Sequence, residues 1–208
     1  MAEDFRVQRR KGMIAIAASV VVLVGLWFLL AKAVPPLARL DSFEARMMFT
    51  LKGLAAAVLF TLVLGVEAVA HERLSSPAFD PLSGFETRRL RVNKQYLQNT
   101  LEQTVVLAAT VLGLAAFAKG GADMREVAAT LVVWVLGRWA FWIGYHRSAA
   151  MRGLGAAGMA LIMVLLVIVA ARFGGELAGP IGAAAPVVLF LAIEALLFLK
   201  TRPVEPGL

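Results

Sequence analysis

Six apolar segments, each close to the length that crosses a bilayer, constrain this chain more than any other feature of its sequence. A transmembrane helix needs about 20 mostly apolar residues. Segments of that kind lie at residues 13–34, 47–70, 96–118, 126–145, 153–173 and 179–199. Prolines, glycines and serines separate most of them, as is typical of turns. The sequence therefore predicts an all-α integral membrane protein with six spans.

The composition supports this class and argues against others. Hydrophobic residues make up 60% of the 208 residues and charged residues 17%, whereas a soluble domain has about 25% charged residues. The net charge is +7, but the basic residues cluster at the ends of apolar segments, so anionic lipid and small molecules are expected partners and nucleic acid is not. His71 and His146 have no spaced cysteine or carboxylate partners, so no metal site is expected. The chain has no cysteine, so any thiol chemistry needs a thiol from the substrate.

The first apolar segment admits a second interpretation, a cleaved signal peptide. It follows four basic residues and ends near the small-x-small triplet Ala31-Lys32-Ala33. Its apolar run is about 20 residues, however, whereas a signal peptide has about 7 to 15. A retained helix is therefore the favoured interpretation.

The distribution of lysine and arginine predicts the orientation, because cytoplasmic loops are enriched in both. With a cytoplasmic N-terminus and six spans, thirteen of these residues face the cytoplasm: Arg6, Arg9, Arg10, Lys11, Arg73, Arg88, Arg89, Arg91, Lys94, Arg147, Arg152, Lys200 and Arg202. The opposite face receives five: Arg39, Arg46, Lys119, Arg125 and Arg172. Both termini are thus expected in the cytoplasm, with a bacterial inner membrane as the expected location.

Polar residues inside the third and fourth segments are the candidate functional residues. Gln95, Asn99 and Glu102 share one helical face by their spacing. On the next segment Arg138 and Tyr145 share a face, and a guanidinium at membrane depth usually faces protein or water. We expect Glu102 and Arg138 to pair across the two helices, because a carboxylate and a guanidinium make a strong polar contact. An alternative is that these residues serve as polar links between helices.

These residues also carry a resemblance to a known family. Asn99-x-x-Glu102, followed by Arg138, Tyr145-x-Arg147-Ser148-Ala149 and Arg152, resembles the MAPEG family, the membrane-associated proteins in eicosanoid and glutathione metabolism. The resemblance covers roughly residues 47–173, which implies the family's four-helix bundle in a divergent, bacterial-type member. Residues 1–46 and 174–208 would each add one transmembrane helix, expected to wrap the outside of the bundle.

The resemblance implies a function and roles for named residues. Family members are typically homotrimers that hold glutathione between subunits at the cytoplasmic side. By resemblance, the co-substrate glutathione would be bound by Gln95, Asn99, Glu102, Arg138, Tyr145 and Arg147. Arg152 would lie beside the thiol and stabilise the thiolate, which is the nucleophile that attacks a lipophilic substrate.

Three positions depart from the family pattern and keep alternatives open. Gln95 stands where the family usually has arginine, Gln103 where a tyrosine often follows the glutamate, and Phe141 where a tyrosine is usual. A binding or assembly protein of the same fold, without glutathione chemistry, is therefore the second hypothesis. The third is a small transporter that uses Glu102, Arg138 and Glu194 as a charged pathway.

Overall fold

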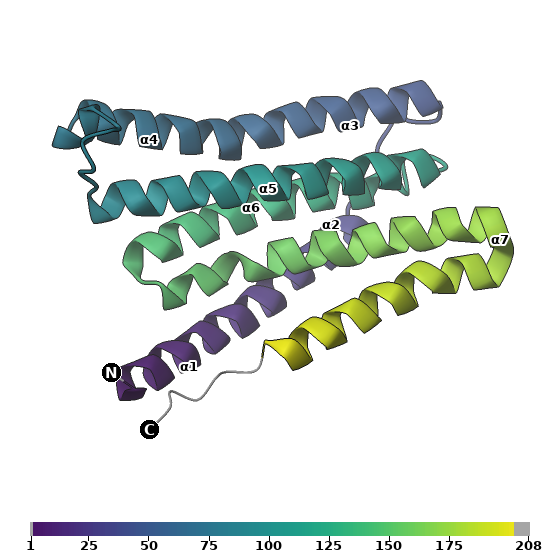
Figure 1. Cartoon of the computed structure of the whole chain (residues 1–208). Coiled ribbons are helices and arrows are strands. Elements are labelled where there is room, and N and C mark those ends of the chain that lie inside the picture. Colours follow the sequence, from purple (N-terminus) through teal and green to yellow (C-terminus); the bar gives the residue numbers. More distant parts are fainter. Residues whose placement is uncertain (1, 202–208) are drawn as a thin grey trace. The chain divides into compact units, whose positions relative to one another are not determined.

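In the computed structural model, which describes residues 2–201 and their side chains from residue 6 onward, every regular element is a helix (Figure 1). Arg202, expected in the cytoplasm, lies outside the described residues. The elements in chain order are α1 (Ala2–Ser19), the π-helical η1 (Val20–Val24), α2 (Gly25–Ala33), α3 (Phe43–Val58), the π-helical η2 (Leu59–Val63), α4 (Leu64–Leu74), the 3-10 turn η3 (Pro77–Phe79), α5 (Arg88–Phe117), α6 (Met124–Arg147), the 3-10 segment η4 (Ala150–Gly155) and α7 (Ala156–Lys200).

Five helical stretches of the described chain are long and apolar enough to cross a membrane, which supports the predicted integral membrane class. They run Arg6–Ala33, Phe43–Leu74, Arg88–Phe117, Met124–Arg147 and Ala150–Lys200. The last stretch has 51 residues and contains both the fifth and the sixth predicted segments. The number of crossings, six, stays a prediction.

The chain divides into two compact units, Met1–Met163 and Val164–Leu208. In the second unit α7 breaks at Ala178 and Gly179, where Gly179 has a φ of +60° that glycine adopts without strain. Beyond the break the helix turns back on itself (Figure 1). The two arms approach backbone to backbone, since a Cβ on Gly174 would lie 2.1 Å from the carbonyl oxygen of Gly182.

In the first unit the helix ends sort into two groups. At one end, Arg88 Nη1 at the start of α5 donates to the carbonyl oxygen of His146 at the end of α6, at 2.9 Å. At the other end, Arg125 Nη1 at the start of α6 donates to the carbonyl oxygen of Val34 after α2, at 2.8 Å. The first end also carries the start of α1 and the loop between α4 and α5 (Figure 1). Within this unit, the basic residues expected in the cytoplasm therefore gather at one end.

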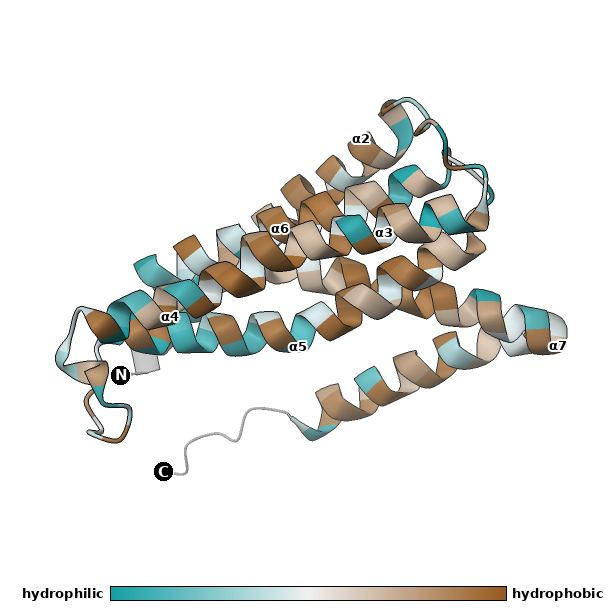
Figure 2. Cartoon of the chain, turned by 90° about the horizontal axis from the view of Figure 1, so that it is seen from above, coloured by the Kyte–Doolittle hydropathy of each residue, from teal (hydrophilic) through white to brown (hydrophobic). Residues whose placement is uncertain are grey.

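One expectation about the helices was wrong. The third helix starts at Arg88, not near residue 96, because Thr87 caps it by accepting from the Leu90 amide at 2.9 Å. Its polar first turns continue as helix at the hydrophilic end of the bundle, where α4 and α5 are richest in polar residues (Figure 2). The first helix packs against α6 and η4, and its expected place on the outside of the bundle stays a prediction.

A stripe of buried residues at four-residue spacing packs the first helix against its neighbours. Ala15, Ser19, Leu23, Trp27 and Ala31 are all less than 7% exposed. Ser19 Oγ accepts from the amide of Ala157 at 3.2 Å, and Trp27 Nε1 donates to Thr130 Oγ1 on α6 at 3.0 Å. Interhelical hydrogen bonds of this kind, together with small residues that allow close packing, hold helices together in lipid.

Candidate functional site

The turn after α6 is the part of the chain where predicted site residues meet. Gly144 lets this turn fold closely onto the helix, because a Cβ there would lie 2.2 Å from the carbonyl oxygen of Met151. Ser148 closes the turn: its amide donates to the Gly144 carbonyl oxygen at 3.0 Å, and its Oγ accepts from the Met151 amide at 3.3 Å. The turn holds Arg147 and Arg152 exposed at the end of the helix.

Tyr145 at the end of α6 and Arg152 in η4, two residues that the family resemblance assigns to one site, lie near one another. The guanidinium carbon of Arg152 is 6.0 Å from the centre of the Tyr145 ring, and the Tyr145 ring lies 5.7 Å from the ring of Phe141. Among the residues that the structure describes, Arg152 forms no ion pair. Its charge is therefore available to an anion from outside the chain.

Arg138 does not pair with Glu102, which corrects the sequence-based expectation. Its Nη1 donates to Gln103 Oε1 at 3.0 Å, and its Nη2 donates to Thr100 Oγ1 at 3.0 Å. Glu102 lies on the neighbouring face of α5 and accepts instead from Gln98 Nε2 at 2.7 Å. Arg138 is 2% exposed, so it links α5 to α6 rather than lining a surface cleft.

Two aromatic rings complete the surroundings of the buried guanidinium. Its carbon lies 4.4 Å from the centre of the Phe141 ring and 5.2 Å from that of Tyr96. Arg138 Nε has no hydrogen-bond partner in the described chain. A buried arginine among neutral acceptors and ring faces is stabilised by cation–π attraction and two hydrogen bonds, not by a carboxylate.

The other predicted ligand residues on α5 face outward from the chain. Gln95 and Glu102 are exposed and Asn99 is half-buried. In the described residues none of the three forms a hydrogen bond with Tyr145, Arg147 or Arg152. The α5 group and the α6 turn therefore do not form one site through direct hydrogen bonds within a single chain.

Sequence reasoning missed a polar centre built on Asn93, six residues before Asn99 on α5. Asn93 Oδ1 accepts from Trp142 Nε1 at 2.9 Å and lies 2.9 Å from His146 Nε2, while Asn93 Nδ2 donates to the carbonyl oxygen of Ala68 on α4 at 3.3 Å. Three helices thus meet at one side chain that is 3% exposed. The available signal was the four-residue spacing of Trp142 and His146, which puts both on the α6 face that meets α5.

Comparison with known families places this geometry in context. The model of the MAPEG family matches residues 48–172, more than half of the chain. The chain belongs to the MAPEG family. Comparisons with curated proteins and with solved structures found no significant match. The matched range contains most of α3, all of α4 to α6 and the Arg152 turn of this MAPEG protein, whereas α1 and α2 lie outside it.

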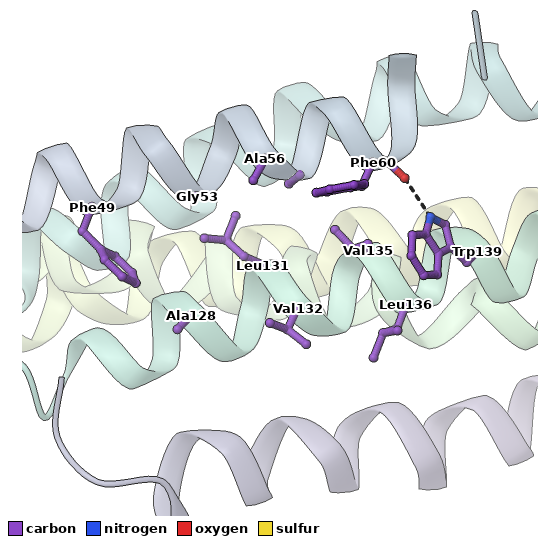
Figure 3. A pocket seen from close by; sticks show the side chains of 11 residues that line it. Phe49, Gly53, Ala56, Phe60, Ala128, Leu131, Val132, Val135, Leu136 and Trp139 are labelled. Carbon is purple, nitrogen blue, oxygen red and sulfur yellow. Dashed lines mark hydrogen bonds between the residues drawn. The ribbon is translucent and has the colours of Figure 1, made fainter. Parts of the chain in front are cut away.

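An apolar groove of about 360 Å³ runs between α3 and α6 of the MAPEG unit (Figure 3). Phe49, Gly53, Phe60, Leu131 and Trp139 line it, with further small and aliphatic side chains between them. Trp139 Nε1 donates to the carbonyl oxygen of Phe60 at 2.7 Å at one end of the groove. Phe60 belongs to the π-helical η2. A π-helical turn replaces the usual α-helical hydrogen bonds with bonds between residues five apart, and such turns are frequent at functional sites.

Proposed function

We propose that this MAPEG protein is a membrane-embedded transferase that ionises glutathione, or another small thiol, beside Arg152 for attack on a lipophilic electrophile. The observation that carries the proposal is the exposed Arg152 of η4 beside the half-buried Tyr145 at the end of α6, inside the range that the family model matches. Family membership supports a glutathione-related membrane class. The thiol, the acceptor and the residue roles are our proposal.

The charge of Arg152 suits the proposed step. A thiol such as that of free cysteine has a pKa of about 8.5, and a neighbouring guanidinium favours the thiolate. In the step itself, the thiol proton leaves to solvent and the sulfur lone pair forms a C–S bond with the electrophilic carbon. The displaced electron pair leaves with the leaving group, or, when the acceptor is an activated double bond, moves to the adjacent atom, which then takes a proton from solvent.

The outward face of α5 supports binding between subunits. Gln95, Asn99 and Glu102 would be costly if they faced lipid, because unsatisfied polar groups in hydrocarbon cost several kcal/mol. We expect this face to meet the Arg152 turn of a neighbouring copy in a homotrimer, where glutathione would contact both. Glutathione has two carboxylates and an ammonium group, which match guanidinium and carboxylate side chains. Arg147, exposed beside Tyr145, is the second basic group we assign to this site.

The acceptor is expected to enter from the bilayer, because the helices are apolar and the groove between α3 and α6 offers no charged lining residue. We place the thiol site at the cytoplasmic face, where the thirteen basic residues are predicted to lie, with both termini on that side. The inner membrane of a bacterium is the proposed location.

Steady-state conjugation of glutathione to a lipophilic electrophile tests this function. The full chain in lipid nanodiscs is compared with Arg152→Ala and with Arg10→Gln, which removes an exposed arginine of α1 outside the proposed site. We expect Arg152→Ala to lower kcat/KM at least tenfold and Arg10→Gln to leave it unchanged. Equal activity of Arg152→Ala and the unaltered protein would remove Arg152 from the mechanism.

A binding or assembly protein without thiol chemistry is the second candidate, and one observation favours it. Phe141 replaces a tyrosine of the family pattern. Its ring packs against the buried Arg138, with the guanidinium carbon 4.4 Å from the ring centre. Gln103 is likewise engaged by Arg138 at 3.0 Å. Absence of glutathione binding at millimolar concentration, in a correctly folded trimer, would favour this candidate over the transferase.

A further inference from the structure

A second cavity, of about 290 Å³, lies between α1 and the turn that carries Arg152. Gln8, Arg9, Met13 and Ile16 line it from α1, and Arg152 lines it from η4. The two backbones come close here, because a Cβ on Gly153 would lie 3.0 Å from the carbonyl oxygen of Gly12. The helix that forms one wall lies outside the range matched by the family model, whereas the wall with Arg152 lies inside it, so the cavity forms where the two parts of the chain meet.

The charged groups of the cavity have the same sign. Two guanidinium groups, Arg9 and Arg152, line it, and the Gln8 amide adds a neutral donor. Within the described chain neither arginine forms an ion pair. Arginine forks match phosphate oxygens in geometry and charge. An anion with several acceptor oxygens is therefore the complementary occupant.

The apolar side of the cavity continues along the helix that enters the membrane. Met13 and Ile16 lie one to two turns after Arg9, and they are 62% and 40% exposed. The first apolar segment begins at residue 13, so Arg9 sits where the chain leaves the polar region. A ligand held at Arg9 has apolar surface beside it on one side and solvent on the other.

We infer that this cavity binds the headgroup of an anionic phospholipid, with the phosphate at Arg9 and the Gln8 amide, an acyl chain along Met13 and Ile16, and the Arg152 charge adding only to the positive potential. Basic pockets between transmembrane helices on the cytoplasmic side bind anionic lipid headgroups for this reason. The inference does not rest on the proposed transferase. It gives the first helix a function, because that helix supplies Arg9, Gln8 and the apolar wall.

Native mass spectrometry of the full chain with dioleoyl phosphatidylglycerol tests the inference, with dioleoyl phosphatidylcholine as the lipid of equal chains and no net charge. The variants are Arg9→Gln and Arg10→Gln, which change the net charge equally on neighbouring positions of one helix. We expect phosphatidylglycerol to bind Arg9→Gln about tenfold more weakly, the effect of losing one charge-assisted contact, and Arg10→Gln to change affinity less than twofold. Equal weakening by both variants would show a diffuse basic surface and would overturn the inference.

Gly12→Leu is a second variant that fills the cavity without altering charge. A Cβ at Gly12 meets its nearest atom, the carbonyl oxygen of Ala150, at an ordinary 3.7 Å, so the helix pair is expected to stay folded. Weaker phosphatidylglycerol binding by this variant supports the cavity, and unchanged binding overturns it. Displacement of the lipid by millimolar inorganic phosphate would show a free-anion site and would also overturn it. Because Arg9 has no part in the proposed thiol chemistry, glutathione conjugation by Arg9→Gln shows separately whether that function stands.

Discussion

Arg138 Nη2 donates to Thr100 Oγ1 at 3.0 Å, in a part of the first unit where Arg138 is 2% exposed. A cation is thus held between α5 and α6 by a threonine hydroxyl, a glutamine carbonyl oxygen and two aromatic rings. This arrangement gives Arg138 a role in joining helices, and of the two arginines Arg138 and Arg152 it leaves the exposed Arg152 to meet an anion.

Thr100→Val tests the link between α5 and α6. Losing a hydrogen bond to a buried charge costs about 1.5–3 kcal/mol, so we expect the free energy of unfolding in micelles to fall by that amount. Thr104→Val is the matched control, because Thr104 makes the same backbone bond one turn later and does not contact Arg138. Equal destabilisation by the two variants would contradict the role assigned to Thr100.

Arg138→Met is expected to change the free energy of unfolding differently from Thr100→Val. Replacing a buried ion and its partners with apolar groups is often neutral or stabilising by about 1–4 kcal/mol. Combining Arg138→Met with Thr100→Val should therefore cost less than the sum of the single variants, since residues in contact are not additive. Thermal unfolding of the three variants measures this coupling, and strict additivity would mean that the two side chains do not interact.

Gly144→Ala is expected to disturb the turn that carries Arg147 and Arg152. The added Cβ would lie 2.2 Å from the Met151 carbonyl oxygen, so the turn must move, at a cost of about 1–3 kcal/mol. Glutathione conjugation should fall with it. Gly25→Ala is the control, since a Cβ there meets nothing within 4 Å and should stabilise the helix by about 0.5–1 kcal/mol. A fully active, fully stable Gly144→Ala protein would show that the turn tolerates displacement.

Asn93→Leu removes the polar centre that joins α4, α5 and α6. Trp142 Nε1 then loses its acceptor, and because this bond is part-buried the cost is expected at the lower end of about 1–3 kcal/mol. We expect lower stability, and the tryptophan fluorescence should shift as Trp142 changes its surroundings. Gln98→Leu, an exposed position on the same helix, should change neither. If both variants unfold alike, Asn93 has no special role.

Much of the helical framework was predictable from the sequence, because a bilayer requires runs of apolar residues. Tyr145 and Arg152 were assigned to one site through the family resemblance, not through their spacing. The partner of Arg138 was not predictable, since spacing groups Gln95, Asn99 and Glu102 on one face of α5 without telling which face meets α6. In the structure the adjacent face turns inward, and Thr100 and Gln103 take the contact.

The packing of the first helix was also hidden in the sequence. Its sides are nearly uniformly apolar, so hydropathy does not tell which face of the helix is buried against its neighbours. The structure buries the stripe from Ala15 to Ala31, which contains small residues and Trp27 at four-residue spacing. In lipid, close contact and polar links decide which face packs, and neither shows in a hydropathy pattern.

The central claim is that Arg152 stabilises a bound thiolate, and the pH dependence of thiolate ultraviolet absorbance tests it most directly. The protein in nanodiscs is saturated with glutathione and titrated, beside Arg152→Ala and Arg10→Gln. The account predicts that the pKa of the bound thiol lies below the value of about 8.5 for a free thiol, and that Arg152→Ala alone returns it to that range. A bound thiol with its ordinary pKa in the unaltered protein, or no binding at millimolar glutathione, would contradict the account.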